Sequence, residues 1–332
     1  MTTTIMEQEA RQTPSLIRDQ LKNNQAKAQA LGESIRNNPP KFVYIIGRGS
    51  SDHAGVFGKY LIEIEAGITV AHAAPSVASV YDKQLDLSNT LVLAISQSGR
   101  SPDILSQLAM AKNAGATTVA LVNDETSPLA EQADFLMPLG AGEEKAVAAT
   151  KSYLCTLSAI TQIVAHWTQN QALLDALDAL PEQLQAAIDA ERQLTTQQFQ
   201  DVHNCVVLGR GLGYAVSREI ALKLKEVCSI HAESYSSAEF VHGPIALAGK
   251  RILALEIDVH DESRPYHQEQ IIDLQKRGSK IIHLNQVDTN CHPRTAPLLV
   301  LQKFYVDIAT VSTELGYNPD APQGLNKVTR TQ

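Results

Sequence analysis

Short apolar runs alternate along this chain with longer stretches in which apolar residues recur every three to four positions. In the first half, the apolar runs predict strands at Lys41–Ile46, Leu91–Ile95 and Thr117–Val122. Helical spacing fills the intervals near Asp52–Glu65 and Asp103–Asn113. Because a continuously apolar strand must be covered on both faces, the pattern predicts an α/β fold, with a parallel sheet between layers of helices.

The second half of the chain repeats this order. Phe42–Gly49 resembles Asn204–Gly211, and the paired glycines Gly47 and Gly209 lie 209 − 47 = 162 positions apart. Two further matches keep this offset, one of them after a one-residue gap. A repeat of this length indicates two copies of a whole domain rather than a solenoid. The strands expected in the second copy are Cys205–Leu208, Arg251–Ile257 and Lys280–Leu284.

Helix breakers divide the chain further. Asn37-Asn-Pro-Pro40 ends an N-terminal helical stretch, and Asn-Pro and Ala-Pro pairs follow Tyr317. Two tandem three-layer α/β/α domains of flavodoxin-like architecture are therefore expected. The expected boundaries are 1–38 for the N-terminal helical segment, 39–168 for the first domain, 169–198 for a helical linker, 199–314 for the second domain and 315–332 for a C-terminal tail.

Composition narrows the class of protein. The net charge of −8 over 332 residues argues against a nucleic-acid partner, because such binding depends on Lys and Arg contacts to phosphates. Apolar runs stay short of the ~18 residues that would predict a membrane span, and the N-terminus lacks a signal-peptide pattern. The cysteines show neither paired nor metal-ligand spacing, which favours reduced, mostly buried thiols in a cytoplasmic protein and no metal site. They are Cys155, Cys205, Cys228 and Cys291.

A polar loop follows the strand at Leu91–Ile95. Ser96-Gln-Ser-Gly99 leads into a helical pattern that starts near Ser101. Backbone N–H groups, a helix dipole and hydroxyl groups at such a position favour phosphate binding. The alternative is a polar turn whose serines cap the helix. At the 162-residue offset, the second copy has Asp258-Val-His-Asp-Glu262, whose carboxylates would repel phosphate. The pattern therefore predicts an anion site in the first copy only.

A second glycine-rich strand end, Gly47-Arg-Gly-Ser-Ser-Asp52, offers further donors. Ser50 and Ser51 begin a predicted helix, where an anion would be favoured, and the glycines allow close backbone approach. The recurrence of the glycines at Gly209-Arg-Gly211 is equally consistent with a purely structural turn. A direct ligand role for the two serines is the functional interpretation.

The predicted helix Arg218–Cys228 carries Glu219, Lys223 and Glu226 on one polar stripe. One interpretation is an exposed ladder of ion pairs, worth a few tenths of a kcal/mol per pair. The other is a carboxylate at the edge of a cleft, held by a neighbouring lysine and acting as a proton shuttle. Spacing by itself favours the exposed ladder.

Polar side chains are dense in Ile230–Ile245, which includes two histidines and two glutamates. His242 precedes Gly-Pro and would lie on a turn, available to an active site. A buried, hydrogen-bonded histidine is the competing interpretation. Lys327 lies near the C-terminus, where lysines are usually solvated, and pattern reasoning assigns it no role.

Together these residues resemble the sugar isomerase (SIS) superfamily, and in particular the isomerase half of glucosamine-6-phosphate synthases and the stand-alone SIS-type glucosamine-6-phosphate deaminases. The resemblance covers nearly the whole chain. It rests on Ser96–Ser101, Ala221–Glu226, His231–Pro244 and Leu325–Thr329, with Met6, Glu9 and Pro14 similar to the family's opening helix. Ser-Gln-Ser-Gly by itself marks only the superfamily, whereas the combination is specific. The resemblance implies two tandem SIS domains.

The resemblance also implies roles for single residues. Glu226 would move a proton between C1 and C2 of the sugar, with Lys223 nearby to favour its ionised form. His242 would assist ring opening from the neighbouring subunit of a homodimer. Lys327 and the backbone of Val147 and Ala148 would contact the open sugar. The sugar phosphate would be held by Ser51, Ser96, Gln97, Ser98 and Ser101, with Ser50 beside them.

Two departures from the family pattern stand out. Gly49-Ser50-Ser51 replaces a common Gly-Thr-Ser, and Ala149 replaces a serine that would give one hydroxyl contact to the sugar. The glutaminase domain of the synthases has no counterpart in the ~38 residues before the first repeat, and no cysteine precedes Cys155. A site that isomerises and aminates sugars without that ammonia supply is expected to run in the catabolic direction.

The expected activity is that of a cytoplasmic glucosamine-6-phosphate deaminase, which converts glucosamine 6-phosphate and water to fructose 6-phosphate and ammonia. No metal and no redox cofactor is expected, because fixed donors can stabilise the developing charge. The expected ligand is a phosphosugar, with no nucleic acid and no membrane. Three alternatives stay open: a galactosamine-6-phosphate deaminase or fructosamine-6-phosphate deglycase, a plain aldose–ketose isomerase, and a regulator that senses sugar phosphates without turnover.

Overall fold

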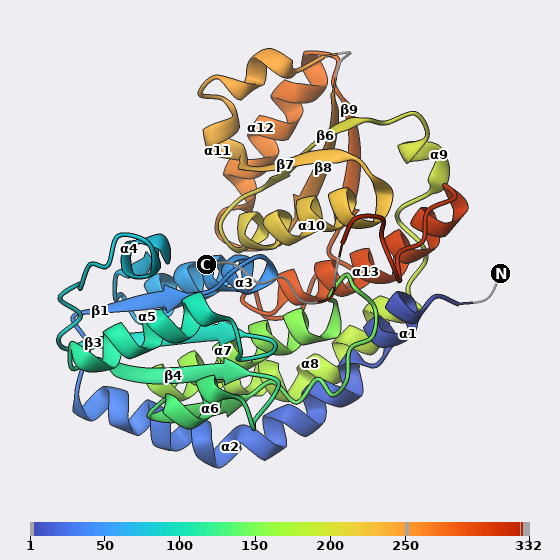
Figure 1. Cartoon of the computed structure of the whole chain (residues 1–332). Helices are drawn as coiled ribbons and strands as arrows, with labels where there is room; N and C mark the ends of the chain where they lie inside the picture. The colour runs from blue at the N-terminus through green and yellow to red at the C-terminus, as the bar shows by residue number, and fades with distance from the viewer. Residues whose placement is uncertain (1–2, 250–251, 326, 328–332) are drawn as a thin grey trace. The chain divides into compact units, whose positions relative to one another are not determined.

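The structure is a computed structural model that describes residues 3–249, 252–325 and 327. It divides into two compact units (Figure 1). The first-sheet unit comprises residues 15–143 and 151–178, and the second-sheet unit comprises 1–14, 144–150 and 179–327. Two of the boundaries, 14/15 and 178/179, fall inside helices α2 (Thr13–Asn37) and α8 (Gln171–Asp189), and the other two lie at 143/144 and 150/151. Among the described residues, no helix is long and apolar enough to cross a membrane.

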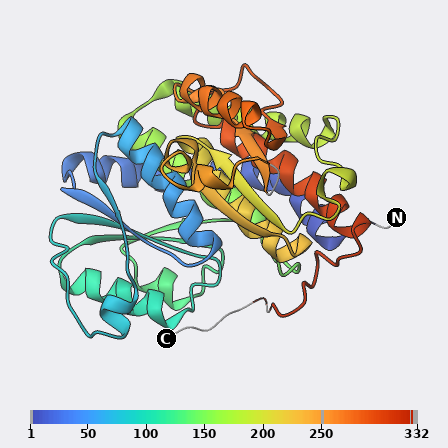
Figure 2. The same ribbon diagram turned by 90° about the horizontal axis from the view of Figure 1, so that it is seen from above.

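The first-sheet unit is built on five parallel strands in the order β2-β1-β3-β4-β5. All seven residues of β3 are buried, as expected for a strand covered on both faces. Figure 2 shows the strands between teal helices on one side and blue α3 on the other. The strands are β1 (Phe42–Ile46), β2 (Val70–His72), β3 (Thr90–Ser96), β4 (Thr117–Val122) and β5 (Phe135–Pro138). The helices are α2, α3 (Ser50–Glu65), α4 (Ser76–Ser79), α5 (Pro102–Asn113), α6 (Pro128–Gln132) and α7 (Lys151–Thr168).

The second-sheet unit has four parallel strands in the order β7-β6-β8-β9. Helix α10 covers one face of this sheet, and α11 and α12 lie on the other (Figure 1). The strands are β6 (Asn204–Gly209), β7 (His231–Ser236), β8 (Leu253–Asp258) and β9 (Lys280–Asn285). The helical elements are α1 (Ile5–Arg11), most of α8, α9 (Thr196–Phe199), α10 (Leu212–Cys228), α11 (Ser237–Phe240), η1 (Pro244–Leu247), α12 (Arg264–Lys276) and α13 (Ala296–Glu314).

The predicted α/β fold with two parallel sheets is confirmed, and the predicted strands are observed with shifts of one or two residues at their ends. Arg251, the first residue of one predicted strand, and Asn326, Val328 and Thr329 of the expected tail lie outside the described residues. Three short or polar strands, β2, β5 and β7, were not predicted. The helical linker expected at 169–198 is not one continuous helix, because residues 190–195, between α8 and α9, are non-helical.

Candidate functional site

The predicted phosphate loop lies at the carboxyl end of β3, directly before α5. The Ser96 hydroxyl oxygen accepts a hydrogen bond from the Gly99 N–H at 3.0 Å, which closes the loop into a tight turn. Gly99 has a φ of +64°, and a Cβ there would lie 2.1 Å from the Ser127 hydroxyl oxygen. Only glycine fits this position. Ser101 is the N-cap of α5, yet its side chain makes no capping hydrogen bond. The Ser101 hydroxyl therefore does not cap the helix, as the alternative interpretation would require.

The second serine segment lies at the same edge of the sheet. Strands β1 and β3 are parallel neighbours, so Ser50 and Ser51, at the start of α3, follow the carboxyl end of the strand beside the serine loop. An ion pair joins the two segments: Arg48 Nε donates to Asp103 Oδ2 at 2.7 Å. The structure thus brings the two sets of predicted phosphate donors to one sheet edge, where two helices begin.

Two carboxylates next to the serine loop are compensated by arginines. Asp103 is fully buried and pairs with Arg48. Asp124 accepts from the Arg100 guanidinium at 2.8 Å. Hydrogen bonds from the Thr126 hydroxyl and from Arg100 lower the pKa of Asp124 to about 2. Each carboxylate thus lies beside a cation, so neither opposes an anion as an unpaired charge would.

The acidic stripe predicted on α10 is buried. Lys223 Nζ lies 3.0 Å from Glu219 Oε1 and 2.6 Å from Glu226 Oε2. The exposed fractions of the Glu219 and Lys223 side chains are 0% and 1%, while that of Glu226 is 19%. The interpretation as an exposed ladder is therefore wrong. Burial by itself would lower the pKa of Lys223, but the two carboxylates outweigh it and raise that pKa above its usual value. The lysine stays protonated, and Glu226 is the member of the triad that reaches solvent.

Helix α13 supplies a further contact to this triad. The Tyr305 hydroxyl, which is fully buried, lies 3.4 Å from Glu219 Oε1. No sequence pattern indicates this contact, because Tyr305 is one of many aromatic or aliphatic residues in a long apolar helix. The innermost carboxylate is thus held from two helices, and Lys223 is held through it.

Lys327 lies against the loop that contains Val147 and Ala148. Its ammonium donates to the Ala146 carbonyl at 2.5 Å and lies 3.4 Å from Glu144 Oε2. The Val147 N–H donates to the Asp320 carbonyl at 3.0 Å, and Ala148 is buried. The structure therefore brings these three predicted sugar contacts together within the second-sheet unit. Sequence reasoning missed Glu144, a buried carboxylate in an otherwise ordinary polar stretch.

His242 lies in the turn between α11 and η1, as predicted, and it is exposed. The competing interpretation as a buried histidine is wrong. Across residues 3–249 and 252–325, no hydrogen bond or ion pair joins its ring to another side chain, Glu226 included.

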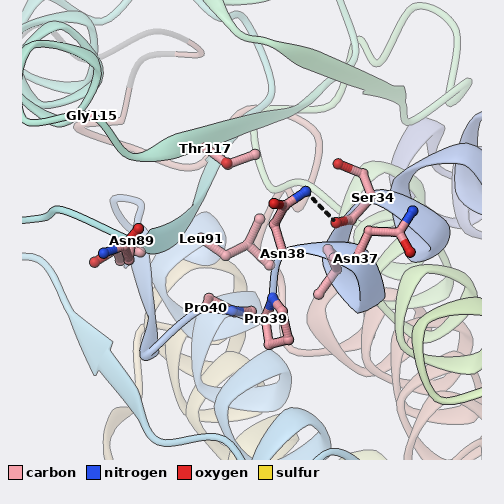
Figure 3. Close-up of a pocket in the computed structure, with 11 residues that line it drawn as sticks. Ser34, Asn37, Asn38, Pro39, Pro40, Asn89, Leu91, Gly115 and Thr117 are labelled. Atoms are coloured by element: carbon pink, nitrogen blue, oxygen red, sulfur yellow. Dashed lines mark hydrogen bonds between the residues drawn. The ribbon is translucent and has the colours of Figure 1, made fainter.

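A cavity of about 440 Å³ lies in the first-sheet unit, but not at the serine loop (Figure 3). It is lined by the end of α2 and by the amino ends of β3 and β4, including Asn38, Asn89 and Thr117. The serine loop lies at the other ends of these strands, roughly 20 Å away for a seven-residue strand. Among the described residues, no cluster of His, Cys, Asp and Glu is arranged to hold a metal ion.

The fold and this set of residues define a doubled parallel-sheet α/β protein with a serine–glycine loop at one strand end and a buried lysine–carboxylate triad on the other unit. The family model of the SIS domain matches residues 38–166 and 198–299, more than half of the chain. The chain therefore belongs to the SIS domain family.

Similar proteins agree with this assignment. The chain is 33% identical over 310 residues to a glutamine–fructose-6-phosphate aminotransferase (isomerizing) from Clostridium tetani, which covers 86% of this chain and 51% of that protein. It thus spans about half the length of the curated relatives it matches. A crystal structure of a candidate phosphosugar isomerase from Silicibacter pomeroyi has a TM-score of 0.89 at 35% identity and covers 96% of this chain and 100% of its own. A glucosamine-6-phosphate deaminase from Thermotoga maritima, at 20% identity, has the same fold with a TM-score of 0.73, covering 95% and 99%.

Proposed function

We propose that this chain is a glucosamine-6-phosphate deaminase. Glucosamine 6-phosphate and water are converted to fructose 6-phosphate and ammonia. After the pyranose ring opens, the C2 proton moves to C1, which leaves an imine at C2. Water then hydrolyses the imine, and the C–N bond breaks with release of ammonia. This proposal is narrower than membership of the SIS family, and it depends on the residue roles that follow.

The phosphate group is assigned to the serine loop and the start of α3. Ser96, Gln97, Ser98 and Ser101, with Ser50 and Ser51, would supply hydroxyl and backbone donors. The observation in support is that both segments lie where helices begin at one sheet edge, and that Asp103 and Asp124 beside them are paired with arginines. The local field is therefore suited to an anion although the chain carries a net charge of −8.

The observation that carries the proposal is the buried triad on α10. Glu226 is the partly exposed member of this triad, and the other two members, Glu219 and Lys223, are buried. An ammonium donating at 2.6 Å fixes the carboxylate and compensates its charge. A carboxylate that is positioned in this way can take the C2 proton and return it to C1 as a general acid–base group. Lys223 is then a positioning residue, and Glu226 is the catalytic one.

The remaining roles concern the open sugar and its formation. Val147, Ala148 and Lys327, which the structure groups together, would contact the open chain, and His242 would assist ring opening. We propose a homodimer in which the exposed His242 serves the neighbouring subunit. The relatives include a glutamine–fructose-6-phosphate aminotransferase and a glucosamine-6-phosphate deaminase, which favours an amino sugar phosphate as the substrate.

The deciding experiment incubates the purified protein with glucosamine 6-phosphate and measures ammonia and fructose 6-phosphate together. Equal amounts of the two products are expected. Interconversion of sugar phosphates without ammonia would replace the proposal with an aldose–ketose isomerase. Ammonia from galactosamine 6-phosphate or a deglycase product from fructosamine 6-phosphate, but none from the glucosamine compound, would change the substrate. Binding without turnover of any of them would indicate a sensor.

A further inference from the structure

The loop that contains Val147 and Ala148 is held by backbone hydrogen bonds to partners far away in the sequence. Glu9, on α1, accepts from the Lys145 N–H at 2.5 Å through one carboxylate oxygen and from the Ala146 N–H at 3.1 Å through the other. The exposed fraction of Glu9 is 5%. Two consecutive amides are thus fixed by one buried carboxylate, which a neutral amide side chain could not match, because it has a single acceptor oxygen.

The helix that carries Glu9 is itself tied to the C-terminal tail. The Asp320 carboxylate accepts from the Ile5 and Met6 N–H groups at 2.9 and 2.8 Å and so caps the start of α1. The Asp320 carbonyl accepts from the Val147 N–H. Three successive amides of the loop, at positions 145, 146 and 147, are therefore set by α1 and the tail together.

The same loop also positions Lys327. Its ammonium donates to the Ala146 carbonyl, and Ala146 is the residue whose N–H binds Glu9. Glu144 completes the arrangement: one oxygen accepts from the Thr150 N–H at 2.9 Å, and the other lies 3.4 Å from the Lys327 ammonium. A shift of the peptide groups beside Ala146 would therefore displace both the loop backbone and the lysine.

We propose that Glu9 is a positioning residue for the sugar-chain end of the site. It fixes the loop at residues 145–148, and through Ala146 it fixes Lys327, so that both can bind the open polyol chain of a sugar phosphate. The inference rests on the proposed function for the roles of Val147, Ala148 and Lys327. The loop amides and Lys327 that these contacts fix belong to the second-sheet unit, whereas the phosphate donors belong to the first-sheet unit, so we expect the effect of Glu9 to be specific to the polyol part of the ligand.

The test uses Glu9→Gln, with Glu7→Gln on the same helix as the matched control, because the Glu7 carboxylate pairs only with Arg11 in the described contacts. The probes are glucitol 6-phosphate, an open-chain polyol phosphate that cannot react, and inorganic phosphate. In Glu9→Gln, glucitol 6-phosphate should bind at least 10-fold more weakly, while inorganic phosphate stays within about twofold of the wild type. Hydrogen exchange of the amides at 145 and 146 should accelerate. Glu7→Gln should change none of these.

Several results would overturn the inference. These are equal weakening of both probes, unchanged binding of glucitol 6-phosphate, or a wild type that does not bind this polyol phosphate. If Glu9→Gln does not fold, Glu9→Asp is used instead. Aspartate keeps the charge, but its side chain is one methylene shorter and cannot reach both amides. The same selective loss of glucitol 6-phosphate binding is expected. A wild type that binds glucitol 6-phosphate but releases no ammonia from glucosamine 6-phosphate would refute the deaminase and leave this test intact.

Discussion

Helices α3 and α10 occupy the same place after the first strand of their units, yet their buried faces have opposite chemistry. At the 162-residue offset, α10 carries Glu219, Lys223 and Glu226 where α3 carries Phe57, Leu61 and Ile64. Phe57 and Leu61 are fully buried, as are Glu219 and Lys223. The scaffold therefore does not need charges at these positions, because an apolar helix fills them in the other unit. The charges on α10, which cost desolvation energy, point to a function.

The loops that follow β3 and β8 show the reverse division. Strand β3 ends in Ser96, and Ser98 and Gly99 follow it, whereas β8 ends in Asp258, whose carboxylate accepts from Arg264 at 2.8 and 2.9 Å. Gly99 has a left-handed φ, but Asp261, which stands at the matching position, does not. Each unit thus keeps one specialised element and fills the other position with ordinary packing or ion pairs. Under the proposed function, the duplicated fold divides phosphate binding and proton transfer between its two copies.

The largest effect is expected from Glu226→Gln, which removes the base and keeps the shape. We predict a loss of turnover of about 10³-fold, within the range for a missing general base, with sugar-phosphate binding largely retained. Ammonia release and glucitol 6-phosphate binding are the measurements. Glu233→Gln, at an exposed position of β7, is the control and should retain full activity. Unchanged turnover in Glu226→Gln would remove this carboxylate from its assigned role.

Gly99→Ala tests whether the serine loop needs its unusual backbone. We predict a loss of at least about 3 kcal/mol in the free energy of unfolding, because the new Cβ would meet the Ser127 hydroxyl and Val122 in addition to the strain of the left-handed φ. Gly115→Ala is the matched control: its φ is +79°, but a Cβ there meets nothing within 4 Å. It should lose only about 1 kcal/mol. Equal losses in denaturant titrations of the two variants would show that only the φ matters.

Ser96→Asp copies the acidic strand end of β8 into the serine loop. Aspartate can still accept from the Gly99 N–H, so the loop should keep its turn, but its charge repels an anion. At about 4 Å and an effective dielectric of 20, one charge contributes up to about 4 kcal/mol. We therefore predict that KM for the sugar phosphate rises about 100-fold. Ser96→Ala, which adds no charge, should raise KM less. The interpretation fails if alanine is as harmful as aspartate.

The smallest effect concerns a polar network found only in the second-sheet unit. Glu256 and His267 lie buried between β8 and α12, where the first-sheet unit has Ala94 and Leu105. Burial lowers the pKa of His267 to about 4. Since the unfolded chain binds this proton near pH 6.5, protonation favours unfolding, and the wild type loses stability as the pH falls from 6.5 towards 4.

His267→Leu places at this position the residue type of Leu105, and it should remove this pH-dependent loss of stability. The wild type should lose about 2 kcal/mol more than the variant between pH 7 and pH 5. Denaturant titrations of both proteins at the two pH values measure this difference. Parallel losses would mean that His267 is not the group that titrates.

The sequence patterns predicted the strands best where the structure depends on residues that are near neighbours in the chain. The run at Leu91–Ile95 predicted a central strand, because continuous apolarity at strand length has few other solutions. Strand β7 was missed because four of its six residues are polar, and its position at the sheet edge leaves most of them partly exposed. Strand β2 has only three residues, too few to show alternation.

In the candidate site too, some residues could be predicted from the sequence and others could not. Serines, glycine and a helix start are adjacent in the sequence, so the phosphate loop could be found without coordinates. Glu9, Glu144 and Asp320 could not be assigned in this way, because their partners lie at distant positions and hydrogen bonds to backbone amides leave no trace in residue type. The stripe on α10 was visible, but spacing predicted the wrong environment for it.

By itself, the sequence determined a doubled α/β chain with serines and glycine at one strand end, because apolar periodicity and turn chemistry act between near neighbours. The tertiary structure decided which charges are buried and what they face, since burial depends on elements that meet only after folding. Lys223 is the clearest case. The spacing of its neighbours on the helix is the same whether the lysine is exposed to solvent or buried in an ion cluster. The packing of α13 against α10 buries it.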